Sequence, residues 1–227
     1  SWTTMSVNPI VVKDLPYDPV KDFRPVSGLM RSQIALAVPA SSSMRSVEDL
    51  VAAARTGKSL NIGTQAAGFH IILEWFNSLA GLKPVHVPYK NSGHLNTDLV
   101  GGQVDAAMDG TASLGALFRG GKLRLLAVSG EKRDPAFPDV RTFREAGFPD
   151  FVSYAWGSFA VRAETPDELV QRLADGMQKV MGSSAAREFT AKIGSELMPL
   201  GPAAMRRFQM EDRKSTRLNS SHVALSR

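Results

Sequence analysis

The chain has no cysteine, only four histidines and no long apolar run. Without cysteine it forms neither a disulfide bond nor a thiolate metal site, although this absence does not fix the compartment. No apolar stretch approaches the ~18–20 residues that span a bilayer. The histidines, at positions 70, 86, 94 and 222, do not cluster with carboxylates at metal-ligand spacing. We therefore predict no metal site and no cofactor.

The sequence also lacks the patterns of nucleophilic catalysis. Ser92 and Ser129 are not in the Gly-x-Ser-x-Gly setting of a nucleophile elbow. No pairing of a nucleophile with a base is evident along the chain. We predict no catalytic residue and no enzyme activity.

Positive charge is concentrated at the end of the sequence. The formal net charge of +5 is compatible with nucleic-acid binding. However, residues 212–227 hold four basic residues and one acidic residue, so the remaining chain has 23 basic and 21 acidic residues, a net charge of +2. We therefore expect no nucleic-acid partner.

The basic end itself has an unusual sequence. Asp212 to His222 reads DRKSTRLNSSH, which resembles a sequencing-adapter read translated in one frame. The alternative is a basic, serine-rich disordered tail. We interpret residues 212–227 as a non-native adapter-like tail, expect the natural sequence to stop near Glu211, and base no functional argument on this segment.

Strand-like and helix-like patterns alternate from residue 60 to residue 129. Strand patterns at 59–64, 84–89, 103–110 and 123–129 are separated by helix patterns, which predicts an α/β fold with parallel strands and right-handed crossovers. The helix pattern at 69–81 carries an apolar stripe suited to packing on a sheet, formed by Ile72, Trp75, Phe76 and Leu79.

Local signals predict several other elements. Ser46, with Asp49 three residues later, predicts a capped helix start. Thr165 followed by Pro166 predicts another. We also expect a brief helix at 141–147. Residues 1–28 contain three X-Pro steps, which favour extended and turn conformations.

Two strand–helix turns are candidates for anion binding. One spans Gly63 to Gly68 and the other spans Lys90 to Gly93. Each offers backbone N–H groups at the start of a helix, which suit an anion such as a carboxylate. A single glycine turn is more often a tight connection, but two such turns on neighbouring strands would form one cradle.

Several phrases occur in a recognisable order: LPYDPVKDF, SVEDLVAAA, NIGT, HVPYK, TDLVGGQVDAAMD, LRLLAVSGEKRDPAFPDV, TFREAGFPDF and AWGSFAVRAETP. Together they resemble the tripartite tricarboxylate transporter substrate-binding receptors, the Bug-type periplasmic solute-binding proteins. The resemblance extends from Ser1 to about Phe208. It implies an α/β, two-lobed periplasmic binding protein of the type II arrangement, in which each lobe is a sheet flanked by helices.

The resemblance also implies where the lobes lie. We place lobe 1 at residues 1–37 plus 157–211, with its N-terminal part missing, and lobe 2 at 38–156. The extended runs at 33–39 and 153–161 are the candidates for strands that cross between the lobes. The family's first strand–helix turn, which grips a ligand carboxylate, has no counterpart here. The turn at 63–68 is about two residues shorter than the commoner version, with Phe69-His70 where small residues are usual.

By position, the resemblance implies a set of ligand-binding residues in the interlobe cleft. They are Thr3; Gly63, Thr64, Gln65, Ala66, Ala67 and Gly68 of the first turn; Asn91, Ser92 and His94 of the second; and Asp109 and Trp156.

The residue types themselves leave alternatives open. Asp109 could receive a ligand amine or cap the following turn, and Trp156 could stack on a ligand or fill the hinge. A loop lysine such as Lys90 is usually solvated. His70 is more often structural or solvent-facing, and His86 is expected to be a packed or hydrogen-bonded strand residue.

We therefore predict a periplasmic receptor that binds a small organic carboxylate and delivers it to the membrane permease subunits of a tripartite tricarboxylate-type transporter. We expect it to act as a monomer and to perform no chemistry. The alternative is the ligand-sensing domain of a regulator or sensor, which can use the same architecture.

Overall fold

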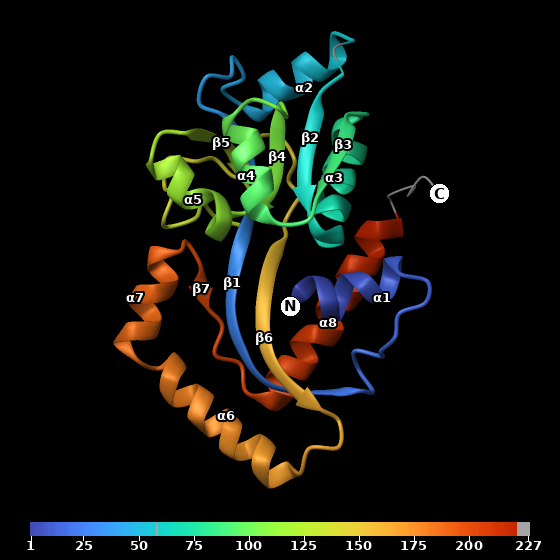
Figure 1. The fold of residues 1–227 in the computed structure, drawn as a ribbon, viewed down its shortest axis with the longest axis vertical. Coiled ribbons are helices and arrows are strands. Elements are labelled where there is room, and N and C mark those ends of the chain that lie inside the picture. Colours follow the sequence, from blue (N-terminus) through green and yellow to red (C-terminus); the bar gives the residue numbers. More distant parts are fainter. Residues whose placement is uncertain (58, 222–227) are drawn as a thin grey trace. The chain divides into compact units, whose positions relative to one another are not determined.

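The computed structural model describes residues 1–57 and 59–221 (Figure 1). The chain forms two compact units. The first comprises Ser1–Arg31 and Ala155–Ser221, and the second comprises Ser32–Tyr154. Two strands, β1 (Phe23–Pro39) and β6 (Tyr154–Arg162), contribute residues to both units. These strands include the runs that the sequence predicted to cross between lobes.

The second unit is built on a sheet with the strand order β3-β2-β4-β1-β5. Its bounds are β2 (Asn61–Gln65), β3 (Val85–Tyr89), β4 (Ala106–Gly110) and β5 (Leu123–Val128). β2 pairs in parallel with both β3 and β4, as the alternating pattern predicted. β1 lies antiparallel between β4 and β5, an insertion that the local pattern did not reveal.

Four helices belong to this unit: α2 (Val47–Arg55), α3 (Ala66–Ala80), α4 (Ser92–Val100) and α5 (Thr111–Arg119). The predicted capping box at the start of α2 is confirmed. Ser46 Oγ accepts the Asp49 N–H at 3.1 Å, and Asp49 Oδ2 accepts the Ser46 N–H at 3.1 Å. Gly81, at a φ of 66°, provides the left-handed residue that ends α3.

One cluster of aromatic residues packs around α3. Phe76 is fully buried, and its ring packs edge-on against Phe143, Phe148 and Phe151 at centroid distances of 5.3, 5.2 and 5.8 Å. Trp75 contacts Phe151 at 4.7 Å. The predicted apolar stripe is wrong at Leu79, which is 45% exposed. The buried face of the helix instead continues to Ala80.

Residues 141–147, which the sequence predicted as a brief helix, form turns. Thr142 and Glu145 hold this segment by a reciprocal pair of bonds, in which each backbone N–H donates to the other side chain, at 2.8 and 3.1 Å. Gly147 then takes a φ of 93°, which ends the turn before a second helical turn can form.

The first unit contains β6, a short strand β7 (Glu196–Leu197) that pairs antiparallel with β1 at Met30 and Arg31, and several helices. These are η1 (Thr3–Val7, a π-helix), α1 (Asn8–Val11), α6 (Asp167–Met181), α7 (Ser184–Lys192) and α8 (Pro202–Ser221).

Three expectations for the first unit need correction or remain open. Residues 3–11 are helical, although the sequence predicted extended and turn structure. Pro166 takes the N-cap position of α6 without a side-chain cap, so Thr165 does not cap this helix. α8 continues through residues 212–221, which makes this part of the predicted tail helical. Residues 222–227 lie outside the described residues, and the non-native origin of 212–227 stays a prediction.

Candidate ligand-binding site

Three strand–helix turns lie at one edge of the sheet in the second unit. β2, β3 and β4 lie side by side and run in the same direction, so their carboxyl ends meet at this edge (Figure 1). α3 follows β2 at Ala66, α4 follows β3 at Ser92, and α5 follows β4 at Thr111. The crevice outside the carboxyl ends of parallel strands is the usual ligand site of α/β sheets. The sequence predicted the first two turns and missed the third.

The first turn combines an unusual backbone with an uncapped helix. Ala66 has a φ of 66°, the only positive φ of a non-glycine residue in the described part of the chain. A left-handed alanine costs roughly 1–2 kcal/mol and is typical of functional turns. Gln65 occupies the N-cap position of α3 without a side-chain cap bond. No capping side chain therefore competes with a ligand for the backbone N–H groups at Ala67 and Gly68.

Two residues of this turn have structural roles. A side chain at Gly63 would place its Cβ 2.4 Å from Leu95 of α4, so glycine is needed there for close packing. Thr64 is 2% exposed, and its Oγ1 lies 2.8 Å from His86 Nε2. The Thr64 hydroxyl is thus engaged within the unit, and any ligand role for it stays a prediction.

His86 sits in a stacked pair. Its ring lies parallel to that of His70 at a centroid distance of 3.7 Å, with 7° between the planes. Burial, followed by the proximity of His70, lowers the pKa of His86 to about 4. His86 is therefore neutral at pH 7 while it bonds to Thr64. The prediction of a hydrogen-bonded strand histidine is confirmed, and His70 takes the structural one of the two positions predicted for it.

The second turn begins α4 with a filled cap. Asn91 Oδ1 accepts the backbone N–H of His94 at 3.0 Å, so Asn91 acts as the N-cap. His94 is exposed. Just before the turn, Tyr89 donates to Asp98 Oδ2 at 2.8 Å, and burial together with this bond raises the pKa of Tyr89 to about 12. The second turn is thus held in place by hydrogen bonds from side chains in and next to it.

Asp109 is where the three turns meet. It is 1% exposed, and its Oδ1 accepts the Gly110 N–H at 2.8 Å and a Gln65 amide N–H at 3.4 Å. The hydroxyls of Ser92, from the second turn, and Ser113, from α5, also act on this carboxyl group. The structure thus brings Gln65, Ser92 and Asp109 together, three residues that the sequence placed at the site.

Thr3 and Trp156 belong to the first unit. The sequence placed Thr3 at the end of a strand, but it begins the π-helix Thr3–Val7. Trp156 is 4% exposed, and its ring packs edge-on against Phe208 at 5.5 Å. Packing in the interior of the unit is sufficient to explain a tryptophan at position 156. The ligand role of Thr3 and Trp156 stays a prediction.

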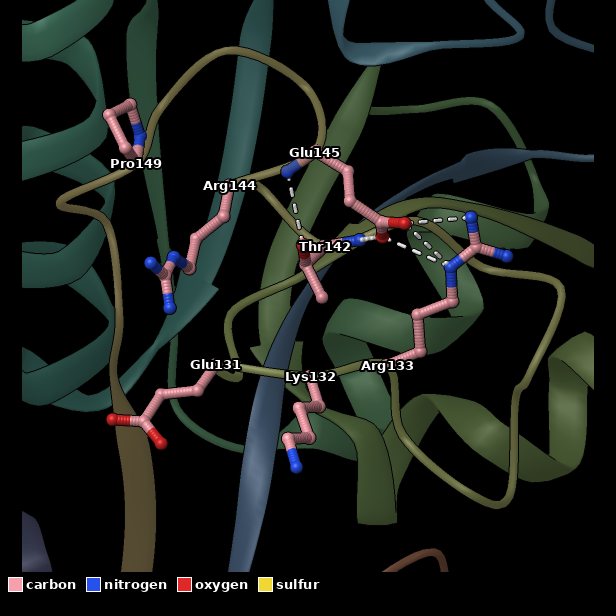
Figure 2. Close-up of a pocket in the computed structure, with 7 residues that line it drawn as sticks. All are labelled: Glu131, Lys132, Arg133, Thr142, Arg144, Glu145 and Pro149. Carbon is pink, nitrogen blue, oxygen red and sulfur yellow. Dashed lines mark hydrogen bonds and ion pairs between the residues drawn. The ribbon is translucent and has the colours of Figure 1, made fainter.

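A separate pocket of about 580 Å³ lies in the second unit (Figure 2). None of the residues predicted for the site lines it, and no sequence signal pointed to it. The lining residues are Glu131, Lys132, Arg133, Thr142, Arg144, Glu145 and Pro149. On one side of the view, the guanidinium of Arg133 bonds to both oxygens of Glu145, with its Nε at 3.0 Å from each (Figure 2).

The Arg133–Glu145 ion pair leads to a testable prediction about the pKa of Glu145. The hydrogen bond from Arg133, followed by that from the Thr142 N–H, lowers the pKa of Glu145 from its ordinary 4.5 to about 2. A lowered folded-state pKa contributes stability that is present above about pH 4.5 and lost as the pH falls through 2. Arg133→Gln is expected to return the pKa of Glu145 toward 4.5 in an NMR titration of its carboxyl carbon. A wild-type value near 4.5 would contradict this geometry.

None of the helices in the described part of the chain combines the length and apolar character needed to cross a bilayer. Within residues 1–57 and 59–221, no three histidine, aspartate or glutamate side chains converge as a metal site.

Comparison with known proteins identifies the family. The family described as "Tripartite tricarboxylate transporter family receptor" matches residues 1–219. The chain belongs to this family. The family is one of receptors and not of enzymes, in agreement with the predicted absence of enzyme activity.

Individual relatives agree with this assignment. A UPF0065 protein of Bordetella bronchiseptica is 32% identical over 200 residues, which cover 88% of this chain and 57% of that protein. The chain thus spans just over half the length of this curated relative. The R. palustris protein Rpa4515, solved with adipate, is 29% identical with a TM-score of 0.92, over 98% of this chain and 75% of that one.

A second solved protein, MatC of Rhodopseudomonas palustris, has malate bound. It is 25% identical to this chain, with a TM-score of 0.88 over 96% of this chain and 76% of that one. These structures, together with that of the periplasmic binding protein BugD at a TM-score of 0.92, confirm the predicted α/β periplasmic binding protein fold.

Proposed function

We propose that this chain is the receptor of a tripartite tricarboxylate-type transporter and binds a small organic carboxylate at the strand–helix turns of its second unit. The observation that carries the proposal is membership of the receptor family together with relatives solved with adipate and malate. The two units would be the receptor's lobes, expected from the sequence at 1–37 plus 157–211 and at 38–156. We further propose that it acts as a periplasmic monomer and passes its ligand to membrane permease subunits.

The helix starts supply the anion-binding groups. In the second unit, α2 and α4 are capped by Ser46 and Asn91, whereas α3 and α5 have no side-chain cap. A helix start carries a partial positive charge and N–H groups that point at an incoming anion. We assign the ligand carboxylate to the start of α3, at Ala67 and Gly68, with α5 beside it.

The energies are sufficient for a receptor. A hydrogen bond to a charged group contributes ~1.5–3 kcal/mol. Several such bonds from preformed turns would leave ~8 kcal/mol after the cost of association, which corresponds to a micromolar dissociation constant. No side chain needs to react covalently with the ligand, which fits a receptor that releases its ligand unchanged.

Isothermal titration calorimetry of the chain tests the proposal. The panel comprises adipate, malate and citrate, with glucose as an uncharged control. We expect at least one carboxylate to bind with a micromolar dissociation constant and glucose to give no heat of binding. No binding of any of the three carboxylates between pH 5 and 8 would overturn the proposed function.

A further inference from the structure

The strand–helix turns of the second unit surround a carboxyl group of the chain itself, the side chain of Asp109. Asp109 stands near the end of β4, opposite Ala35 of β1. Its Oδ1 accepts from Gly110 and Gln65, and the Ser92 and Ser113 hydroxyls act on the same carboxyl group. Each of the three turns thus directs at least one polar group to Asp109. The side chain occupies the same polar environment that a ligand carboxylate requires.

All of these partners are uncharged. Asp109 is the only acidic or basic residue in β2, in β4 and in the part of β1 from Ser32 to Pro39. The elements packed around it carry His70 and Glu74 on α3, His86 on β3, His94 and Asp98 on α4, and Arg119 on α5. Five of these six are engaged elsewhere. His70 stacks on His86, which bonds to Thr64, and Glu74 accepts from Asn77. Asp98 accepts from Tyr89, and Arg119 lies over the ring of Phe137 at 5.6 Å.

One oxygen of the Asp109 carboxyl group differs from the other in its hydrogen bonding. Asp109 Oδ2 is buried and has no hydrogen bond of standard geometry, although the Ser92 and Ser113 hydroxyls are close enough to influence the group. Ser113 Oγ also accepts from Asn96 at 3.2 Å, which leaves its proton free to point toward Asp109. An ionised carboxylate with an unbonded buried oxygen is costly, whereas a protonated oxygen can serve as a donor.

Burial is the dominant influence on this group, and it raises the pKa of Asp109. The hydrogen bonds from Gly110, Ser92, Ser113 and Gln65 act in the opposite direction and are weaker. A second carboxylate brought to the same turns would raise the pKa further, because two like charges in one site cannot both remain ionised.

We propose that the receptor takes up one proton from solvent at Asp109 when a ligand carboxylate binds, so that the ligand meets a neutral hydrogen-bond donor in place of a second anion. This inference rests on the proposed function and deepens it. Asp109 then determines which charge state of the site accepts a ligand. The bound complex holds the ligand anion and one shared proton.

Proton uptake has a defined sign. The pKa of Asp109 is higher in the complex than in the free receptor, so affinity falls as the pH rises through the interval between the two values. Within this interval the dissociation constant rises up to about tenfold per pH unit. Over pH 5 to 8 we expect at least a roughly tenfold weakening of adipate or malate binding.

Calorimetry in two buffers of different ionisation enthalpy measures the proton directly and needs no substitution. We expect the wild-type chain to take up roughly 0.5 to 1 proton per adipate or malate, as one shared site requires. Asp109→Asn mimics the neutral carboxyl, and its dissociation constant should vary less than about twofold from pH 5 to 8, with no proton uptake.

The outcomes separate the two proposals. Carboxylate binding without proton uptake by the wild-type chain would overturn this inference and leave the proposed function standing. A pH dependence that persists in Asp109→Asn but disappears in His70→Gln or His94→Gln would assign the proton to a histidine and also overturn it. If no carboxylate binds the wild-type chain at any pH, the proposed function fails and this inference fails with it.

Discussion

Replacing Ala67 with aspartate is expected to weaken carboxylate binding by two to three orders of magnitude. Ala67 lies in the first turn of α3, where no side chain caps the helix. Two unit charges ~4 Å apart repel by ~4 kcal/mol at an effective dielectric constant near 20. Each 1.4 kcal/mol corresponds to about a tenfold change in affinity. Calorimetry with whichever of adipate or malate binds the wild-type chain measures the loss.

The matched control is Ala67→Asn, which adds a side chain of the same size without the charge. We expect it to lose no more than about tenfold in affinity, because only steric interference remains. The aspartate variant should melt no earlier than wild type, since an acidic residue in the first turn stabilises a helix by ~0.3–1 kcal/mol. Equal losses in the two variants would show that space and not charge governs the position.

Replacing Phe76 with alanine is expected to destabilise the second unit by about 3–5 kcal/mol. The Phe76 ring is fully buried and contacts three other phenylalanine rings, at 143, 148 and 151. Its removal leaves a cavity beneath α3 and deprives the 143–151 segment of its main apolar contact. Because folded domains are stable by only ~5–15 kcal/mol, this is a large fraction of the total.

Urea denaturation followed by tryptophan fluorescence measures the change, because Trp75 lies next to Phe76 and packs against Phe151. Phe189→Ala is the control for the same chemical change. Phe189 is 55% exposed on α7, and we expect its replacement to change the free energy of unfolding by less than ~0.5 kcal/mol. Similar effects from the two substitutions would contradict the role assigned to the aromatic cluster.

Local signals in the sequence were sufficient for the start of α2 and for the strand–helix alternation of the second unit. The Ser46–Asp49 capping box spans three residues, so its pattern is readable directly. The strand–helix alternation from 60 to 129 likewise reports a repeated local geometry. These features, together with the family phrases, predicted the α/β fold and the first two turns.

Predictions failed where a distant contact decided the outcome. Leu79 continues the apolar stripe in sequence, yet the sheet and the phenylalanine cluster meet α3 on the face of Phe76 and Ala80. Residues 141–147 have helix-forming composition, but Glu145 is bound by Arg133, twelve residues earlier. Residues 3–11 show no periodic signal that would distinguish a short helical segment from turns.

The site illustrates the same limit. Asp109 was singled out from the sequence, but its bond to Gln65 joins positions 44 residues apart. The two alternatives, a ligand contact and a cap for the following turn, were both inferred from Asp109 and its neighbours in the sequence. The structure shows in addition that Asp109 receives polar groups from all three turns, which neither alternative anticipated. The pocket at 131–149 was missed because its lining comes from loop segments whose residues have no distinctive spacing.

The most direct test of the central claim is an NMR titration of the 15N-labelled chain with adipate and malate. We expect saturable shifts of the backbone amides at Ala67 and Gly68 and at the start of α5, with much smaller changes at the capped start of α4. Saturable binding that shifts the amides of residues 131–149 and leaves those at 66–68 unmoved would place the ligand in the other pocket and contradict the assignment of the carboxylate to the strand–helix turns.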